Sequence, residues 1–294
     1  MTLTINTNMS SLIVQSNLNA ATTMLNRSIE RMTTGFKINH AADNAAGYSI
    51  ATNWEKQLSS LDVAADNAAT GADMLTTLED TYSLISSHLQ RVRDLTEQAA
   101  NGTYGSEALI AIKSEITARL EEVDRIAANC EFNGLSMMDG SMGEISLQVG
   151  LYSEASSQTK LSADLFKKAD IATLFKDYGS VTSASVAEVA KLCSGYNGTT
   201  ITGKQNEMLD KIDAVISEIS SRTTTLGSAQ NRIESAIESI AVQSENITSS
   251  LSTLRDADVA EESSNYIRAQ ILQQASATLL ATANQAPSIA LNLL

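Results

Sequence analysis

The sequence predicts a mainly α-helical protein: long antiparallel helices that form a rod and a terminal coiled coil, with a small β-hairpin region in the middle of the chain. The 294 residues include a single proline, so almost the whole chain is free to run as helix. Aromatic residues make up only 4%, although rings normally supply much of the area buried in a compact core. Apolar residues also recur every seven residues in four segments, which places a seam along one side of each helix.

The four seams differ in regularity, and the last is the most regular. Ordinary short bundle helices share this pattern, but the length of the segments favours lengthwise packing. The seams comprise Leu18, Thr22, Leu25, Ile29, Met32 and Phe36; Leu75, Leu78, Tyr82, Ile85, Leu89 and Val92; Leu109, Ile112, Ile116, Leu120 and Val123; and Ile233, Ile237, Ile240, Ser244, Ile247, Leu251 and Leu254.

Turn-forming residues divide the chain into four expected helices, over residues 8–33, 43–100, 106–128 and 205–285. At about 1.5 Å per residue the second would be roughly 85 Å long, and the fourth could exceed about 100 Å. Gly71 lies inside the second helix, where it costs about 1 kcal/mol relative to alanine and could introduce a bend.

The segment between residues 130 and 204 has a different character. Its glycines cluster, and residues 145–149 alternate apolar and polar side chains as a half-buried strand does. We expect a hairpin-rich patch there, followed by a short helix over residues 186–193. The expected domains are an amino-terminal helix over residues 1–40, a helical rod over 41–254 that contains this variable patch, and a carboxyl-terminal helix over 255–294.

The charge balance excludes two classes of partner. Twenty basic and 34 acidic residues give a net charge of −14, which argues against binding to nucleic acid or to anionic membranes. Residues 1–8 contain neither the positive nor the apolar region of a secretory signal. Residues 275–294 are too interrupted by polar residues for a transmembrane span. These signals alone would place the protein in the cytoplasm.

One sequence motif resembles a phosphate-binding loop. Gly198 to Lys204 fits G-x-x-x-x-G-K, but Gln205 stands where a hydroxyl is needed for magnesium, and no apolar strand precedes the motif. A loop that enters the last helix explains the glycines equally well. We therefore expect no nucleotide cofactor.

The other reactive residues form no catalytic or metal-binding pattern. His40 and His88 are far apart, without acids at metal spacing. Cys130 and Cys193 are most simply small buried residues, although a disulfide between them remains open because the sequence does not fix their distance. The acidic doublets at 121–122 and 261–262 fit solvated helix faces, and the sequons at Asn101 and Asn197 fit turns. We expect no catalytic residue, cofactor or metal.

Both ends of the chain resemble bacterial flagellins. Glu30 to Asn39 reads E-R-M-T-T-G-F-K-I-N against the family's E-R-L-S-S-G-L-R-I-N, and similar runs occur at residues 5–8, 45–47, 89–95, 98–103 and 132–134. Near the other end the resemblance includes residues 254–258, 270–275, 283–287 and 293–294. It covers roughly the first 150 and the last 90 residues. Because the middle is short, the chain resembles a minimal flagellin that lacks the large outer domains.

The sequence departs from the family pattern at a few positions. His40, Ala42 and Asn44 stand where the family usually has serine, lysine and aspartate, which puts charge pairing in that turn in doubt. Asp94 replaces a usual glutamate.

The resemblance implies an extracellular subunit of the flagellar filament, exported unfolded by the type III apparatus with a chaperone, which accounts for the missing signal peptide. It implies terminal segments that are disordered in the monomer and pair on assembly. We expect the polymerisation interface to include Leu18, Leu25, Ile29, Met32, Ile267 and Ile271. Further implied partners are hook-associated junction and cap proteins, and a Toll-like innate immune receptor that contacts Gln90, Arg91, Leu95 and Glu115.

Two alternatives come from different classes. A hook–filament junction protein shares the terminal coiled-coil logic, but such proteins typically carry a D-D-P-x-A-A turn, and residues 42–47 contain no proline. A flagellin with an enzyme inserted in its variable region would need a motif between Cys130 and Gly203, and none is present.

Overall fold

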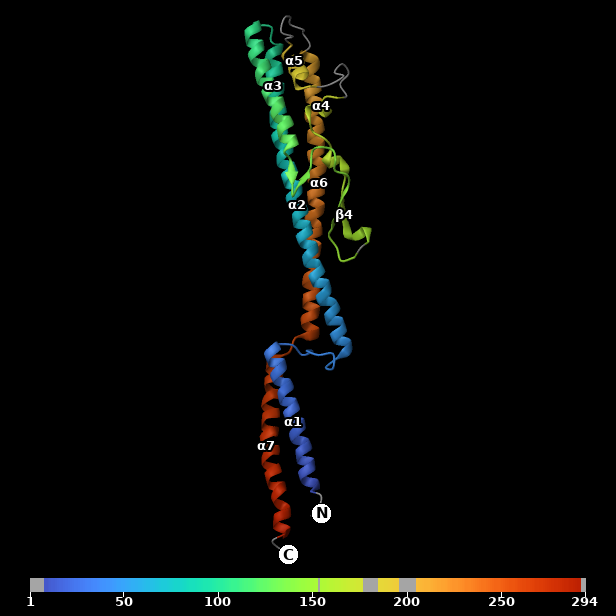
Figure 1. Cartoon of the computed structure of the whole chain (residues 1–294), viewed down its shortest axis with the longest axis vertical. Helices are drawn as coiled ribbons and strands as arrows, with labels where there is room; N and C mark the ends of the chain where they lie inside the picture. Colours follow the sequence, from blue (N-terminus) through green and yellow to red (C-terminus); the bar gives the residue numbers. More distant parts are fainter. Residues whose placement is uncertain (1–7, 153, 177–184, 196–204, 292–294) are drawn as a thin grey trace. The chain divides into compact units, whose positions relative to one another are not determined.

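The structure, a computed structural model, describes residues 8–152, 154–176, 185–195 and 205–291. Its contacts divide the chain into two units (Figure 1). Unit 1 comprises residues 1–59 and 244–294, and unit 2 comprises residues 60–243. The expected domain limits at residues 40 and 254 differ from this division and remain a prediction.

The described elements are mainly helices, as the sequence predicts. In chain order they are α1 (Met9–Thr34), α2 (Ala45–Ala100), α3 (Ser106–Ala128), β1 (Glu131–Phe132), β2 (Leu135–Ser136), β3 (Ile145–Gln148), η1 (Ala155–Ser157), β4 (Gln158–Leu161), η2 (Ala163–Phe166), α4 (Ile171–Leu174), α5 (Val186–Ser194), α6 (Gln205–Arg255) and α7 (Val259–Leu291). β1 pairs with β2 and β3 pairs with β4, both antiparallel.

Unit 2 is built on the apolar seam of α2. Its predicted members Leu75, Leu78, Tyr82, Ile85, Leu89 and Val92 are all fully buried. The predicted seam of α3 is also buried. In the part of the fourth seam that lies in unit 2, Ile233 and Ile240 are buried and Ile237 is half-buried; the members from Ser244 onward belong to unit 1 and are half-buried. The seven-residue spacing therefore predicts the lengthwise packing of the helices in unit 2 correctly.

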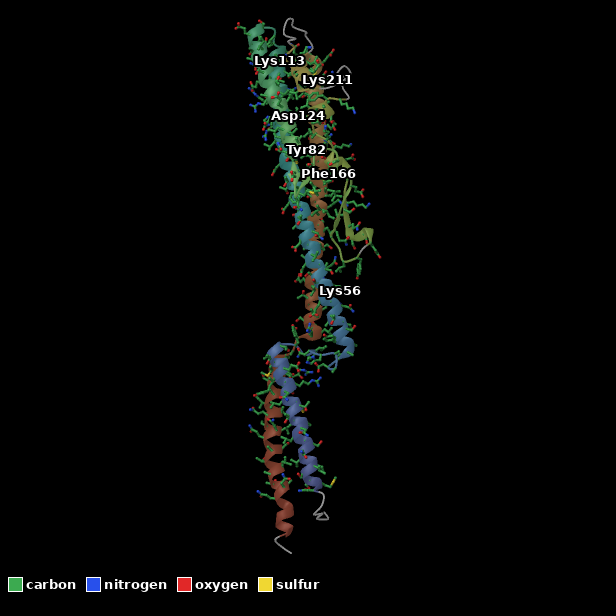
Figure 2. The ribbon with its side chains drawn as sticks, viewed as in Figure 1. Lys56, Tyr82, Lys113, Asp124, Phe166 and Lys211 are labelled. Carbon is green, nitrogen blue, oxygen red and sulfur yellow. The ribbon has the colours of Figure 1, made fainter. Side chains whose placement is uncertain are left out.

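A compact layer from residues 131–176 covers part of this helical core. The Tyr82 hydroxyl on α2 donates a hydrogen bond of 3.1 Å to the carbonyl of Leu165, and Phe166 beside it is fully buried (Figure 2). Arg222 of α6, itself 9% exposed, donates to the carbonyls of Lys167 and Lys168 at 3.3 and 3.4 Å. These bonds satisfy backbone acceptors at the end of η2 and attach the layer to both long helices.

The β3–β4 hairpin contacts α2 at Gly71. A Cβ atom placed on Gly71 would lie 2.4 Å from Cδ1 of Leu147, and the nearby Asn67 side chain donates to the carbonyl of Gln148 at 3.2 Å. The glycine thus provides space for a leucine of the hairpin, while α2 continues through this position as helix.

The expected single helix over residues 205–285 is wrong. α6 ends at Arg255 and α7 begins at Val259. Asp258 caps α7, because its carboxylate accepts hydrogen bonds from the amides of Ala260 and Glu261 at 2.8 and 3.2 Å. The spacing of Asp258 and Glu261 is that of a capping box, a sequence signal that marks a helix start within the apparent continuous helix.

The break between α6 and α7 pairs with the segment after α1. Gly35, at φ +74°, ends α1, and its carbonyl accepts a bond of 2.8 Å from the amide of Ala257. The guanidinium of Arg255 lies 4.2 Å from the centre of the Phe36 ring and also pairs with Glu55. These contacts lie within unit 1 and hold the turn between α1 and α2 against the turn between α6 and α7.

The two helix-internal glycines of α2 and α6 should respond differently to alanine. A Cβ on Gly227 would meet no atom within 4 Å, so Gly227→Ala is expected to raise the free energy of unfolding by about 1 kcal/mol through helix propensity. Gly71→Ala is expected to give no such gain, because Leu147 must leave its position. Urea unfolding of the soluble chain measures both values, and equal gains would contradict the packing role of Gly71.

Candidate assembly interface

α1 and α7 lie side by side in unit 1 and run antiparallel (Figure 1). Four side-chain contacts join them along their length. Asn8 donates to the Ala283 carbonyl at 2.7 Å, Ser11 bonds Asn284 at 2.7 Å, Gln273 bonds Thr22 at 3.3 Å, and Arg31 pairs with Glu262 at 3.6 Å.

Small side chains fill the seam between these two helices. The buried residues of α1 are Ala21 and Ser28, seven positions apart. On α7, Ala269 and Ser276 are buried at the same spacing, and Glu262 continues the series. Such small residues allow two helices to approach closely, but they bury little apolar area. The described buried apolar residues of unit 1 are Ala21, Ile38, Ala51 and Ala269.

The large apolar side chains of α1 and α7 lie mostly outside this seam. Of the predicted interface residues, Leu18 and Leu25 are half-buried beside it. Ile29, Met32, Ile267 and Ile271 are 45%, 40%, 54% and 60% exposed. Other large apolar residues of α1 and α7 are also exposed, although they are not part of the predicted interface: Met9, Leu12, Ile13, Met24, Val259, Leu272 and Leu279.

The apolar surface on the helix pair is also free of charge over most of its length. Residues 1–26 and 269–294 include no Asp, Glu, Lys, Arg or His. Large apolar side chains exposed in this number on two paired helices are typical of an interaction site. Without charges to repel or orient it, this surface is suited to burial against other apolar helices.

The charge contacts of this part of unit 1 lie instead between the carboxyl-terminal end of α1 and the turn before α2. Asp43 accepts bonds from the backbone amides of Asn39 and His40 and pairs with Arg27, and these hydrogen bonds lower the pKa of its carboxyl group. His40 Nε2 lies 2.7 Å from a Glu30 oxygen. The turn therefore contains an ion pair, between Arg27 and Asp43, despite its departures from the flagellin pattern.

The predicted receptor residues differ in how far their side chains are buried. Gln90 is exposed, and the Arg91 and Glu115 side chains, 48% and 39% exposed, pair at 3.0 Å across α2 and α3. Leu95 is only 2% exposed and belongs to the core of unit 2. A partner that approaches this surface would meet the first three residues and not the Leu95 side chain.

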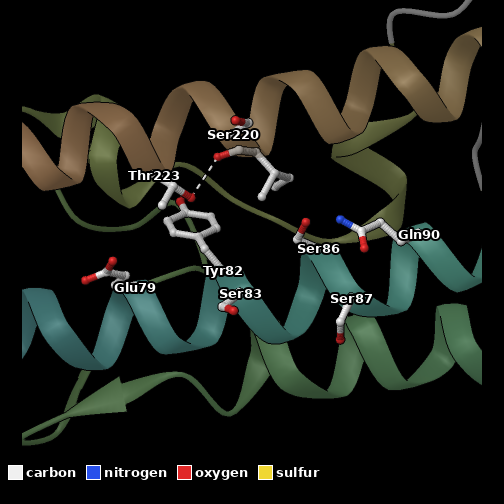
Figure 3. A pocket seen from close by; sticks show the side chains of 9 residues that line it. Glu79, Tyr82, Ser83, Ser86, Ser87, Gln90, Ser220 and Thr223 are labelled. Carbon is white, nitrogen blue, oxygen red and sulfur yellow. Dashed lines mark hydrogen bonds between the residues drawn. The ribbon is translucent and has the colours of Figure 1, made fainter.

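A polar groove of about 390 Å³ lies between α2 and α6 in unit 2 (Figure 3). Hydroxyl groups of serine and threonine dominate its lining, which comprises Glu79, Tyr82, Ser83, Ser86, Ser87, Gln90, Ile219, Ser220 and Thr223. The lining contains no histidine, lysine or cysteine, and its one carboxylate, that of Glu79, accepts a hydrogen bond of 2.8 Å from the side-chain amide of Gln230. Among these described residues, the structure shows no hydrogen bond between this carboxylate and a hydroxyl of the lining.

The remaining reactive side chains are buried or half-buried, or lie outside the described residues. Cys130 and Cys193 are separate, buried thiols, so within this structure they do not form the disulfide that the sequence left open. Burial raises the pKa of Cys193 to about 12 and also raises that of Cys130. His88 is half-buried on α2. The phosphate-loop-like segment 198–204 and the sequon at Asn197 lie outside the described residues.

No group of three or more His, Cys, Asp or Glu side chains is arranged to hold a metal ion in the described parts of the chain. Across those same parts, no helix is both long and apolar enough to cross a membrane.

The geometry thus defines a class of protein: a helical structural protein with an outward-facing, uncharged apolar helix pair suited to self-association. Comparisons with known proteins specify the family. The model of the bacterial flagellin N-terminal helical region matches residues 5–142, and that of the C-terminal helical region matches residues 209–294.

Individual relatives agree with these matches. Polar flagellin F of Vibrio parahaemolyticus is 30% identical over 377 aligned positions, covering 100% of both chains. Flagellin of Xenorhabdus nematophila is 34% identical over 312 positions, covering 99% of this chain and 98% of the relative. A solved structure described as a flagellar hook-associated protein, from Vibrio parahaemolyticus, is 12% identical with a TM-score of 0.61 and covers 73% of this chain and 100% of its own; it shares the fold.

The chain belongs to the bacterial flagellin family. It is accordingly a structural subunit of the extracellular flagellar filament used for motility and not an enzyme. The alignment with polar flagellin F spans 377 positions, whereas this chain has 294 residues, so the chain is a short flagellin.

The two thiols provide a direct probe of the native core. At pH 8 an aromatic disulfide reagent should label neither Cys130 nor Cys193 rapidly, because burial and the raised pKa keep both as neutral, inaccessible thiols. In denaturant, two thiols per chain should react. Rapid labelling of the folded chain, or no reactive thiol after unfolding, would contradict this arrangement.

Proposed function

We propose that α1 and α7 form the inner tube of the filament and that the helices of unit 2 form its outer wall. The observation that supports this most directly is the inverted packing of unit 1. Alanine and serine occupy the seam within the chain, while Leu12, Ile13, Ile267 and Ile271 remain at the surface. Contacts with other copies would bury those side chains, and contacts that do not close produce a helical polymer.

Folding of the terminal helices is coupled to assembly in this proposal. Ordering a residue costs about 1–2 kcal/mol of backbone entropy, and a seam of alanine and serine recovers little of it. Unit 2 has an extensive core of leucine, isoleucine, valine and aromatic residues. We therefore expect unit 2 to be folded in the soluble chain, and α1 and α7 to become stable once neighbouring copies cover their apolar faces.

The same proposal names the further partners. Export of an unfolded chain by the flagellar type III apparatus, with a chaperone that covers its apolar segments, fits terminal helices that fold only on assembly. Hook-associated junction and cap proteins would contact the ends of the polymer. A solved structure described as a flagellar hook-associated protein shares the fold, and this supports the proposed contacts.

A charged residue on the proposed interface should block polymerisation. Leu25→Asp or Ile271→Asp is expected to leave a soluble chain with a folded unit 2, because burying an unpaired carboxylate costs far more than an apolar contact returns. Removal of residues 275–294 should have the same effect. Seeded polymerisation followed by sedimentation and electron microscopy measures this outcome.

The matched control is Tyr152→Asp, which places the same charge on a side chain 62% exposed in unit 2. This variant should polymerise. Normal filaments from Leu25→Asp and Ile271→Asp would refute the proposed interface.

A second proposed function is recognition of the soluble chain by a Toll-like receptor. It is supported by the exposed group formed by Gln90, Arg91 and Glu115, which the Arg91–Glu115 ion pair holds together on α2 and α3. In this proposal Leu95 acts from the core, by packing beneath the surface that the receptor contacts.

Arg91→Ala should reduce receptor signalling by the soluble chain at least tenfold in a reporter-cell titration, because it removes a charge-assisted contact. Its unfolding free energy should change by less than about 1 kcal/mol, as expected for an exposed ion pair. Lys113→Ala, on a half-buried residue of α3 outside this group, is the control and should signal normally. An unchanged titration for Arg91→Ala would refute the receptor surface.

A further inference from the structure

We propose that the ion pair between Arg31 and Glu262 sets the register in which α1 and α7 pair. This inference rests on the proposed function of α1 and α7 as the paired helices of the assembled subunit. It assigns to these two residues a positioning role: they select one of several alignments that the rest of the seam would accept.

The seam itself discriminates poorly between alignments. Ala21 and Ser28 on α1 face a series on α7 in which Ala269 and Ser276 have nearly the same size and the same seven-residue spacing. A slip of seven residues, about 10 Å, would again place small side chains opposite small side chains. The neutral contacts of Asn8, Ser11 and Gln273 can also be re-formed, because serine, threonine, asparagine and glutamine recur throughout both helices.

Glu262 is the exception in this series. It lies seven residues before Ala269 and is only 7% exposed, and its carboxylate is 3.6 Å from Nη1 of Arg31. The Nε atom of Arg31 is buried without a hydrogen-bond partner, so this side chain has already lost much of its hydration. Any slip would separate the two charges while Glu262 remained in the seam. A buried charge without its partner is strongly unfavourable, whereas a buried polar pair is well suited to specifying register.

Several of the neighbouring charges already have other partners. Arg27 pairs with Asp43 and Glu30 with His40, both outside the seam. On α7, Arg268 bonds Asn265 of its own helix. The described residues of α1 before Arg27 and of α7 after Arg268 include no charged side chain. Among the described residues, the Arg31–Glu262 pair is therefore the ion pair that joins the two helices.

A competing explanation is that backbone bonds beyond the helices fix the register. The amide of Lys37 donates to the Arg255 carbonyl at 2.6 Å, and the amide of Ala257 donates to Gly35 at 2.8 Å. These bonds join the turns that precede α2 and α7, and they are unaffected by neutral replacements of Glu262. A measurement of register in such a variant separates the two explanations.

The experiment uses pairs of introduced cysteines in the full chain, cross-linked by copper-catalysed air oxidation after seeded polymerisation. Thr22→Cys with Gln273→Cys reports the observed register, since these side chains are in contact. Thr22→Cys with Tyr266→Cys or with Leu280→Cys reports slips of seven residues. Each pair is compared in the parent chain, in Glu262→Gln and in the charge exchange Arg31→Glu with Glu262→Arg. The chain without introduced cysteines is the control, because Cys130 and Cys193 are buried.

In the parent background we expect filaments and cross-linking only between positions 22 and 273. In Glu262→Gln the ratio of slipped to native cross-links should rise at least about tenfold, the change that corresponds to roughly 1.4 kcal/mol between alignments. The charge exchange should restore the parent ratio. Protection of the Cys193 thiol, read in the same samples, verifies that unit 2 remains folded.

Two results would overturn the proposal. One is an unchanged cross-link ratio in Glu262→Gln, which would assign the register to the backbone bonds at the turns. The other is loss of every cross-link in Glu262→Gln with unit 2 intact, which would show that the pair is needed for pairing itself. Failure of the parent cysteine chains and of the unmodified chain to form filaments would instead refute the proposed function.

Discussion

Close pairing of α1 and α7 through alanine and serine is the constraint on which the behaviour of unit 1 depends. Because small side chains occupy the seam, the two helices can approach closely, and because they bury little area, the pair gains little hydrophobic free energy within one chain. The large apolar side chains that would stabilise it face outward. In the proposed filament, the terminal helices of such a subunit are stabilised mainly by other copies of it.

Unit 2 follows the opposite arrangement. Large side chains at seven-residue spacing pack α2, α3 and α6 along their length, and the layer that includes Phe166 closes one side. Arg222 and Tyr82 attach that layer by hydrogen bonds to backbone carbonyls, and Gly71 provides the space for Leu147. Such a core can keep unit 2 folded in the soluble chain before the terminal helices pair with other copies.

Much of the fold follows from the sequence, because large apolar residues repeated every seven positions form one face of a helix and leave few other ways to bury that face. The limits of α3 and the burial of Leu75 to Val92 illustrate this. The seam between α1 and α7 is harder to predict. A heptad of large apolar residues indicates Leu18, Leu25 and Met32, whereas the buried residues of α1 are Ala21 and Ser28. The break after Arg255 required recognition of Asp258 and Glu261 as a capping box within an otherwise continuous apolar repeat.

Burial was the other property that the sequence could not supply. Leu95 is a matched position in a family motif, but only the packing of unit 2 reveals that its side chain is enclosed. The same holds for the Arg31–Glu262 pair, because these two charges are separated by 230 residues of sequence that give no indication that they meet. Contacts between residues distant in sequence depend on the assembled fold.

Hydrogen–deuterium exchange of the soluble chain and of the sedimented polymer tests the central claim most directly. Coupled folding predicts rapid exchange of the amides of α1 and α7 in the soluble chain, and strong protection of the same amides in the polymer, with α2, α3 and α6 protected within unit 2 in both states. Equal protection of α1 and α7 in the soluble chain would contradict the account, because it would show that the small-residue seam is sufficient to fold them.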